Sequence, residues 1–217
     1  GEAIPFCASF RVTPGHPVML GHYPGRPVVP GTCLLDAALQ AIEIAQPPQE
    51  GRGLGLRQIL GAQFLHVVVP GDPIELTLSR AAPTAARVST WRASFASRSR
   101  QVARAGLCIG PADAASPQEP PSLHVTPAWT VLDPHDVARL LPHRSPLLLV
   151  DAARLSPDGM SLVATRSVSL ADSCYAQLPP AAGGRWLDYP ALLAVESFAQ
   201  AAGLLLGGAG QSGVPLL

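Results

Sequence analysis

The chain has 217 residues, a formal net charge of zero, and 14% charged residues against 47% hydrophobic ones. This composition supports a substantial buried core and excludes a protein that holds nucleic acid through a basic surface. The length suits one large domain or two small ones. No apolar run reaches the ~18 residues that a membrane-spanning helix needs, so we expect no contact with membranes.

The cysteines point to a reducing compartment. The chain contains Cys7, Cys33, Cys108 and Cys174, and none of their spacings is typical of a metal or redox site. We therefore expect free thiols in a cytoplasmic protein without a signal peptide. The chain does not begin with methionine and ends within a pattern, which suggests a piece of a longer polypeptide.

The most informative stretch, GHYPGRPVVPGTCLLDAALQ, follows a predicted strand over residues 8–13. It places His22 in a Gly/Pro-rich turn, and Pro30 is suited to open a helix because its fixed φ fits the first turn. Apolar residues at helical spacing then predict a mostly buried helix over Gly31–Ala45. Asp36 lies on this helix, and burying a carboxylate without a partner is costly. We therefore expect Asp36 either to make a structural pairing or to handle protons, and the nearby histidine favours chemistry.

The residues after this helix alternate in the way that strands do. We expect a polar loop over residues 46–55 and then an antiparallel meander that wraps around the helix. The predicted strands cover residues 56–69, 73–80, 87–97 and 101–109. His66 falls on the first of them, and we expect it to be a packed or edge residue and not a ligand.

A second segment begins after residues 111–127, which are rich in Pro, Ala and Ser and indicate a linker. Asp133 and Pro134 predict a helix start, with the helix over residues 133–141. His143 follows this helix, and we expect it to have a structural role. His16, near the start of the chain, is expected to be a surface or turn residue. A further strand is predicted over residues 161–170.

The stretch around His22 resembles the active-site segment of the β-hydroxyacyl-(acyl carrier protein) dehydratases, the FabA/FabZ-like family. The family pattern G-H-[FY]-P-G-x-P-x-x-P-G-x-x-x-x-[DE]-A-x-x-Q is matched without gaps. Residues 140–151 also resemble the segment that opens a dehydratase domain. The resemblance implies an α+β hot-dog fold, in which an antiparallel sheet wraps around a central helix.

The helix motif occurs twice in the chain. Residues 190–202 align with residues 30–42 at a shift of 160, which places Glu196 on Asp36 and Gln200 on Gln40. We therefore expect a double hot-dog fold: a first module over residues 1–112, a linker over 113–128, and a degenerate, incomplete second module over 129–217. The second copy has Ala182 where the first has its histidine.

Two such modules pair in the family, with the histidine from one and the carboxylate from the other. The resemblance therefore implies His22 and Glu196 as the working pair, with Asp36 opposite the missing histidine. An imidazole suits removal of the α-proton of a 3-hydroxyacyl thioester, and a carboxyl shielded on an apolar helix suits protonation of the leaving hydroxyl. The backbone N–H groups from Gly31 onward would stabilise the enolate oxygen. The residues expected to bind substrate are Tyr23, Gly25, Pro30, Gly31, Gln40 and Gln200.

The expected activity is dehydration of 3-hydroxyacyl thioesters to trans-2-enoyl thioesters in fatty-acid or polyketide biosynthesis. The substrate would arrive on the phosphopantetheine of an acyl carrier protein, with no metal and no cofactor, in a chain that could assemble as a homo- or hetero-oligomer. The alternative is a non-catalytic pseudo-dehydratase subunit that binds acyl chains or completes a partner's site. The lost second histidine motivates that alternative.

Overall fold

The structure is a computed structural model that describes residues 5–46, 54–81, 88–111, 125–176 and 189–208. Its contacts divide the chain into two compact units, residues 1–14 with 28–120 and residues 15–27 with 121–217. The predicted module boundaries follow sequence order alone, whereas this division assigns the segment that carries His22 to the second unit. Most of the predicted linker lies outside the described residues.

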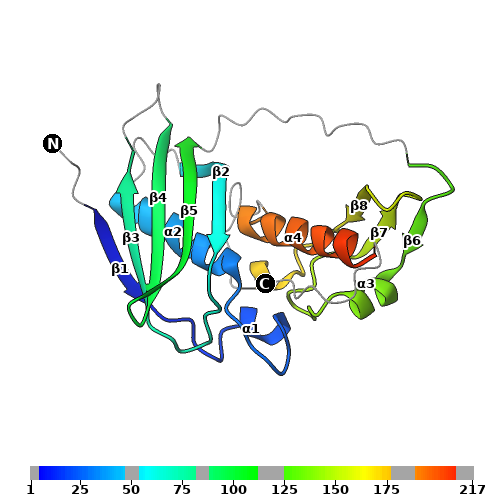
Figure 1. The fold of residues 1–217 in the computed structure, drawn as a ribbon, viewed down its shortest axis with the longest axis horizontal. Helices are drawn as coiled ribbons and strands as arrows, with labels where there is room; N and C mark the ends of the chain where they lie inside the picture. The colour runs from blue at the N-terminus through cyan, green and yellow to red at the C-terminus, as the bar shows by residue number, and fades with distance from the viewer. Residues whose placement is uncertain (1–4, 47–53, 82–87, 112–124, 177–188, 209–217) are drawn as a thin grey trace. The chain divides into compact units, whose positions relative to one another are not determined.

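The first unit is built on one antiparallel sheet of five strands in the order β1-β3-β4-β5-β2 (Figure 1). Buried residues alternate along β3, where Ile74, Leu76 and Leu78 are almost fully enclosed. This alternation gives the sheet one apolar face. The strands are β1 (Phe6–Phe10), β2 (Leu54–Phe64), β3 (Ile74–Arg80), β4 (Ser89–Ser97) and β5 (Arg100–Pro111).

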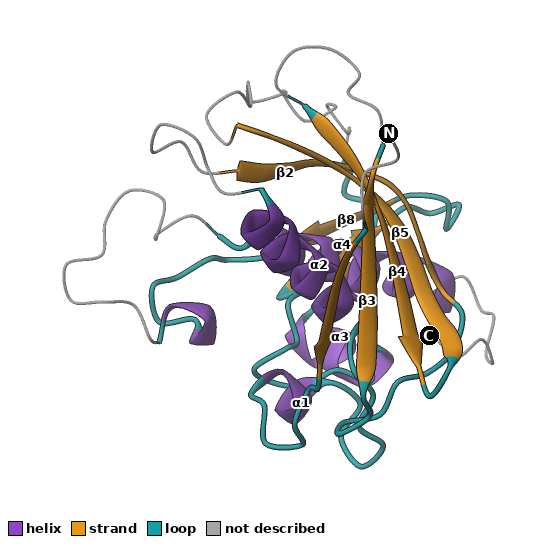
Figure 2. Cartoon of the chain, turned by 90° about the vertical axis from the view of Figure 1, so that its left-hand side faces the viewer, coloured by secondary structure: helices purple, strands orange, loops and turns teal. Residues whose placement is uncertain are grey.

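Helix α2 (Gly31–Ala45) covers the apolar face of this sheet and has the bounds that the sequence predicts (Figure 2). Pro30 precedes it as N-cap residue, with the φ of −56° that its ring imposes. The helix residues that are buried form one stripe, namely Leu34, Leu35, Ala38, Ala41 and Ile42. The burial of this stripe against the sheet is what fixes the helix, because short helices gain most of their stability from packing.

In the first unit, the predicted strands at residues 8–13 and 56–69 extend past the observed ends of β1 and β2. Strand β1 ends at Phe10, and β2 ends at Phe64 and not at residue 69. The backbone N–H groups of Leu65 and His66 both donate to the Val102 carbonyl, at 2.8 and 3.2 Å, so the chain bends away from the ladder there. The predicted strand position of His66 is therefore wrong, because it lies in an exposed bend; that it is not a ligand stays a prediction.

The second unit contains a three-stranded antiparallel sheet in the order β6-β7-β8 and two helices. Helix α4 (Ala191–Gly208) packs on α3 and on β7 and β8. Their shared core consists of Val137, Leu141, Val150, Ala153 and Leu204. The other elements are β6 (Thr130–Leu132), α3 (Pro134–Leu140), β7 (Ala152–Leu155), β8 (Leu162–Thr165) and a 3-10 turn at Ser173–Tyr175.

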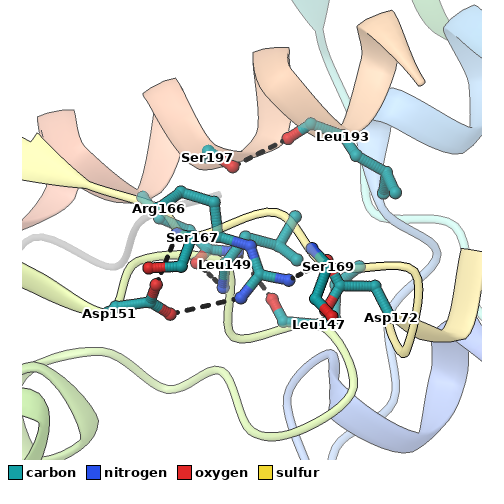
Figure 3. Close-up of polar contacts among 10 residues, drawn as sticks. Leu147, Leu149, Asp151, Arg166, Ser167, Ser169, Asp172, Leu193 and Ser197 are labelled. Atoms are coloured by element: carbon teal, nitrogen blue, oxygen red, sulfur yellow. Dashed lines mark hydrogen bonds and ion pairs between the residues drawn. The ribbon is translucent and has the colours of Figure 1, made fainter. Parts of the chain in front are cut away.

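Charged groups end strand β8 earlier than predicted (Figure 3). The Arg166 guanidinium lies between two carboxylates, 3.2 Å from Asp151 Oδ1 and 2.8 Å from Asp172 Oδ2. The Ser167 N–H donates to Asp151 Oδ2 at 2.6 Å. Burial alone would raise the pKa of Asp151, but the hydrogen bond from Ser167 and the charge of Arg166 outweigh it and lower that pKa. These contacts fold residues 166–172 into a loop where a strand was expected.

The α+β class with antiparallel sheets is confirmed. The first unit has the expected sheet around a central helix, and the described part of the second unit has three strands beside α4. The double hot-dog arrangement of the whole chain stays a prediction. Among the helices that the structure describes, none combines the length and the hydropathy that a membrane crossing requires.

Candidate functional site

His22 lies directly after the short helix α1 (Val18–Gly21), where the chain becomes extended. Its side chain is buried, whereas the neighbouring turn residues 24–27 are exposed. Tyr23 and Gly25 have positive φ values of 52° and 85°, and the Arg26 N–H donates to the Tyr23 carbonyl at 2.9 Å. This tight turn directs the imidazole inward while the Pro/Gly-rich residues remain at the surface. His16 lies in the exposed turn before α1, which confirms the surface or turn position expected for it.

Gly21 brings the His22 segment against the segment that follows α3. A Cβ at position 21 would lie 2.1 Å from the Arg144 carbonyl oxygen and 2.6 Å from the Leu147 nitrogen. Both are backbone atoms, so only glycine allows this approach. The Arg144 N–H donates to the Gly21 carbonyl at 2.8 Å. As a result, the residues on either side of this contact, His22 and His143, are brought together.

The segment that carries His143 is held by capping and turn contacts. Asp133 caps α3 by accepting from the Asp136 N–H at 2.8 Å, as the sequence predicts. The Arg144 side chain donates to the Leu141 and His143 carbonyls at 2.8 and 2.6 Å. These contacts fix the backbone around His143, whose side chain is 5% exposed.

Glu196 and Gln200 face inward from consecutive turns of α4. Their exposed fractions are 6% and 1%. Gln200 accepts from the Leu149 N–H at 2.9 Å and donates to the Leu147 carbonyl at 2.8 Å and to Glu196 Oε1 at 3.1 Å. Both of its amide hydrogens are therefore used internally, and Gln200 holds Glu196 in place where a contact with substrate was predicted.

These residues form one buried cluster within the second unit. A ring nitrogen of His22, a ring nitrogen of His143 and a carboxylate oxygen of Glu196 all lie within 4.8 Å of one another. His143 Nε2 is 3.4 Å from Glu196 Oε1, and the two imidazole centroids are 5.2 Å apart. The Tyr23 ring packs edge-on against both imidazoles. Burial first, and the nearby Glu196 charge second, raise the pKa of Tyr23.

Two imidazoles beside a carboxylate can exchange protons with a bound ligand, and the same set of donors could hold a divalent cation. Within the part of the chain that the structure describes, one other group of this kind occurs, namely Asp133, His135 and Asp136. It lies at the exposed start of α3, where the carboxylate of Asp133 already caps the helix. The buried cluster is therefore the candidate site.

The remaining predicted site residues belong to the first unit. Asp36 is exposed and accepts from the Gln40 amide at 2.6 Å, so the expectation that its carboxylate is buried on an apolar helix is wrong. It lies on the side of α2 opposite the buried stripe. At Gly31, a Cβ would lie 2.5 Å from the Phe64 ring, so this aromatic side chain occupies the space expected for a thioester. Pro30 is buried as the N-cap residue of α2.

His143 is the member of the cluster to which sequence reasoning gave only a structural role. Its position in the Pro-His-Arg segment of residues 142–144 was the available signal, since that segment matches the opening of a dehydratase domain. The replaced histidine of the second copy, at Ala182, lies outside the described residues.

Comparison with known proteins shows that the chain is similar in sequence to dehydratases. The chain is 38% identical over 75 residues to the 3-hydroxyacyl-[acyl-carrier-protein] dehydratase FabZ of Verminephrobacter eiseniae. This match covers 32% of this chain and 50% of that protein. It is 40% identical over 72 residues to the FabZ of an Anaeromyxobacter species, over 30% and 46% of the two chains. The chain thus spans about half the length of the curated relatives that it matches.

More specifically, the family model for the ApeI-like dehydratases, described as ApeI dehydratase, matches residues 4–103. The resemblance of this chain to the FabA/FabZ-like dehydratases is therefore confirmed. Solved structures are less similar. The dehydratase heterocomplex ApeI:P from Xenorhabdus doucetiae has a TM-score of 0.39 at 16% identity, over 49% of this chain and 87% of that one. A mutant of the fluoroacetyl-CoA-specific thioesterase FlK has a TM-score of 0.45 at 16% identity, over 51% and 86%.

Proposed function

We propose that this chain dehydrates 3-hydroxyacyl thioesters to enoyl thioesters, with the substrate carried on the pantetheine arm of an acyl carrier protein. The observation that supports the proposal most directly is the buried cluster, in which an imidazole of the dehydratase motif and a carboxylate of the repeated motif lie within 4.8 Å. The match to dehydratases, including FabZ proteins, provides the reaction class. The pathway would be fatty-acid or polyketide assembly.

In the proposed reaction, neutral His22 takes the proton from the α-carbon of the substrate. The electron pair of that C–H bond forms the double bond, and the C–O bond at the β-carbon breaks with its electrons on oxygen. The protonated carboxyl of Glu196 transfers its proton to that oxygen, which leaves as water. The enzyme is then left with an imidazolium and a carboxylate, and transfer of one proton between them restores both groups.

The burial of both groups suits the assignment of His22 as the base and Glu196 as the acid. His22 is 8% exposed and Glu196 is 6% exposed, so bulk water has little access to either group. Burial by itself disfavours the charged form of any carboxyl group, and an acid catalyst must be neutral before it reacts.

Three single substitutions test the proposed pair. We expect His22→Ala and Glu196→Gln each to lower kcat by about 10²–10⁴-fold, the usual contribution of a general acid or base. Asp36→Asn is the matched control, because it is the repeat equivalent of Glu196 but is exposed, and it should retain kcat within about twofold of the wild type. The assay follows enoyl product from a 3-hydroxyacyl-carrier protein by mass spectrometry.

Two results would contradict the proposal. Loss of turnover in Asp36→Asn with activity retained in Glu196→Gln would assign the carboxylate role to the first copy of the motif. If the folded wild type forms no enoyl product at any enzyme concentration, the chain is a non-catalytic subunit. Two features of the first copy would fit that second outcome: Asp36 is exposed and pairs with Gln40, and a Cβ at Gly31 would meet the Phe64 ring.

A further inference from the structure

One oxygen of the Glu196 carboxyl group faces two nitrogen atoms. Gln200 Nε2 donates to Glu196 Oε1 at 3.1 Å, and His143 Nε2 lies 3.4 Å from the same oxygen. The second distance exceeds that of a full-strength hydrogen bond, as is common for catalytic contacts in a ligand-free site. The Gln200 and His143 side chains are both more than nine-tenths buried, with exposed fractions of 1% and 5%. The contact at Oε1 is therefore shielded from competing water.

The tautomer of His143 follows from its surroundings. A neutral imidazole carries one N–H, at Nε2 or at Nδ1. Among the described residues, His143 Nδ1 is buried and has no hydrogen-bond partner. A proton at Nδ1 would be a buried, unpaired donor and would leave the Nε2 lone pair facing Glu196 Oε1. A proton at Nε2 instead points at an acceptor, so the Nε2–H tautomer avoids the cost of the unpaired donor.

From this geometry we infer that His143 is a positioning residue for Glu196. Together with Gln200 it keeps Oε1 an acceptor, so that Oε2 is the oxygen that carries the proton and delivers it to the leaving hydroxyl. This inference rests on the proposed dehydration and assigns the proton of that reaction to one atom.

Two hydrogen bonds hold the backbone of the segment that begins at His143. Arg144 donates to the carbonyl of His143 at 2.6 Å, and Gln200 donates to the carbonyl of Leu147 at 2.8 Å. Both donors of Oε1 are therefore fixed to the same short segment, residues 143–147. Two nitrogens held at one carboxyl oxygen fix the orientation of the group, and this is the pre-organisation that the proposed role requires.

The inference can be tested with substitutions of His143 that place an N–H group at different positions. The amide nitrogen of His143→Gln can occupy the place of Nε2, that of His143→Asn resembles Nδ1, and His143→Leu removes the donor. We expect kcat to fall about 10²-fold in His143→Asn and His143→Leu but less than about fivefold in His143→Gln, with KM within about twofold throughout. Equal kcat values in the three variants, whether all high or all low, would overturn the inference.

A second measurement does not depend on turnover. The protein is labelled with ¹⁵N-histidine, and an NMR spectrum correlates the ring nitrogens with the carbon-bound ring protons. The signals of His143 are those that disappear in His143→Gln. We expect them to show the Nε2–H tautomer. Glu196→Gln should shift the Nε2 signal of His143. An Nδ1–H tautomer, or a signal that does not respond to Glu196→Gln, would overturn the inference. If the tautomer is as expected but the wild type is inactive, the proposed dehydration fails and the positioning role stands.

The same spectra separate positioning from metal binding. Stoichiometric Zn²⁺, with a chelator-treated sample as control, should leave the His143 ring signals unchanged. Coordinated shifts of the His22 and His143 ring nitrogens on adding one equivalent of Zn²⁺ would assign His143 as a ligand and would overturn the inference, since a ligand nitrogen cannot also carry the proton toward Glu196.

Discussion

Gly21→Ala is expected to damage the site without touching any residue of the cluster. The new Cβ would lie 2.1 Å from the Arg144 carbonyl oxygen, and contacts of this kind are essentially never shorter than 3.0 Å. The two segments must therefore separate by about 0.9 Å, because the atoms that clash are backbone and have no alternative rotamer. Forced separations of this kind in packed regions cost about 1–3 kcal/mol of unfolding free energy.

The displacement acts directly on the two imidazoles, since His22 follows Gly21 and His143 precedes Arg144 in the chain. A misplacement of about 1 Å at reacting groups can reduce turnover by about 10²-fold. We therefore expect Gly21→Ala to lower kcat by about that factor with a smaller effect on KM, and to lower the midpoint of urea unfolding. The Arg144 amide should also lose protection from hydrogen exchange, because its hydrogen bond to the Gly21 carbonyl would lengthen.

The matched control is Gly15→Ala, in the turn before α1, where a Cβ would meet nothing within 4 Å. It should leave kcat and the unfolding midpoint close to the wild-type values. The reasoning is refuted if Gly21→Ala keeps kcat within about twofold of wild type and unfolds at the same urea concentration, or if both alanine variants lose activity to the same degree.

Two further predictions concern ionisable groups. The raised pKa of Tyr23 means that the folded state keeps its phenol proton above pH ~10, where an unfolded tyrosine loses it, so the free energy of unfolding should fall as the pH rises through that window. Ultraviolet titration of phenolate measures this, and Glu196→Gln should lower the Tyr23 pKa only part of the way because burial is the larger cause. Arg166→Gln should lower the free energy of unfolding in urea by about 1 kcal/mol, because it leaves the Asp151 and Asp172 carboxylates without their cation. The loss is no larger because solvent partly screens the Asp151 carboxylate. Arg139→Gln, which breaks a surface pair with a 64% exposed arginine, should leave the urea midpoint close to that of the wild type, and equal losses in the two variants would contradict the prediction.

The sequence predicted best those elements whose stability is local or periodic. Helix α2 has the predicted bounds because Pro30 and a continuous apolar stripe define it, and α3 begins at the predicted Asp133 cap. The exposure of Asp36 could also have been predicted, since this residue falls on the helix side opposite Leu34 and Ala38. The inference failed because it treated the helix as buried all round and not as one apolar face.

Tertiary contacts could not be predicted from the sequence in the same way, because they join residues that are far apart in the chain. Strand β8 ends at Thr165 because Arg166 turns to two carboxylates, one of which lies fifteen residues earlier in the chain. His143 was assigned to structure because the resemblance to the dehydratases places the catalytic histidine at His22, and its partner Glu196 is more than fifty positions away in the chain. The repeat at a shift of 160 did identify Glu196 and Gln200, but not that Gln200 would use its whole amide on Leu147, Leu149 and Glu196.

The assignment of residues 15–27 to the unit formed by residues 121–217 has a practical consequence for anyone who dissects this protein. One cleavage or truncation between the modules would yield a rear fragment that has Glu196 but no His22, and a front fragment whose imidazole has lost its surroundings. Neither half alone would be expected to turn over substrate, and mixing them would test complementation. An independently expressed rear module would need the short front segment grafted onto it.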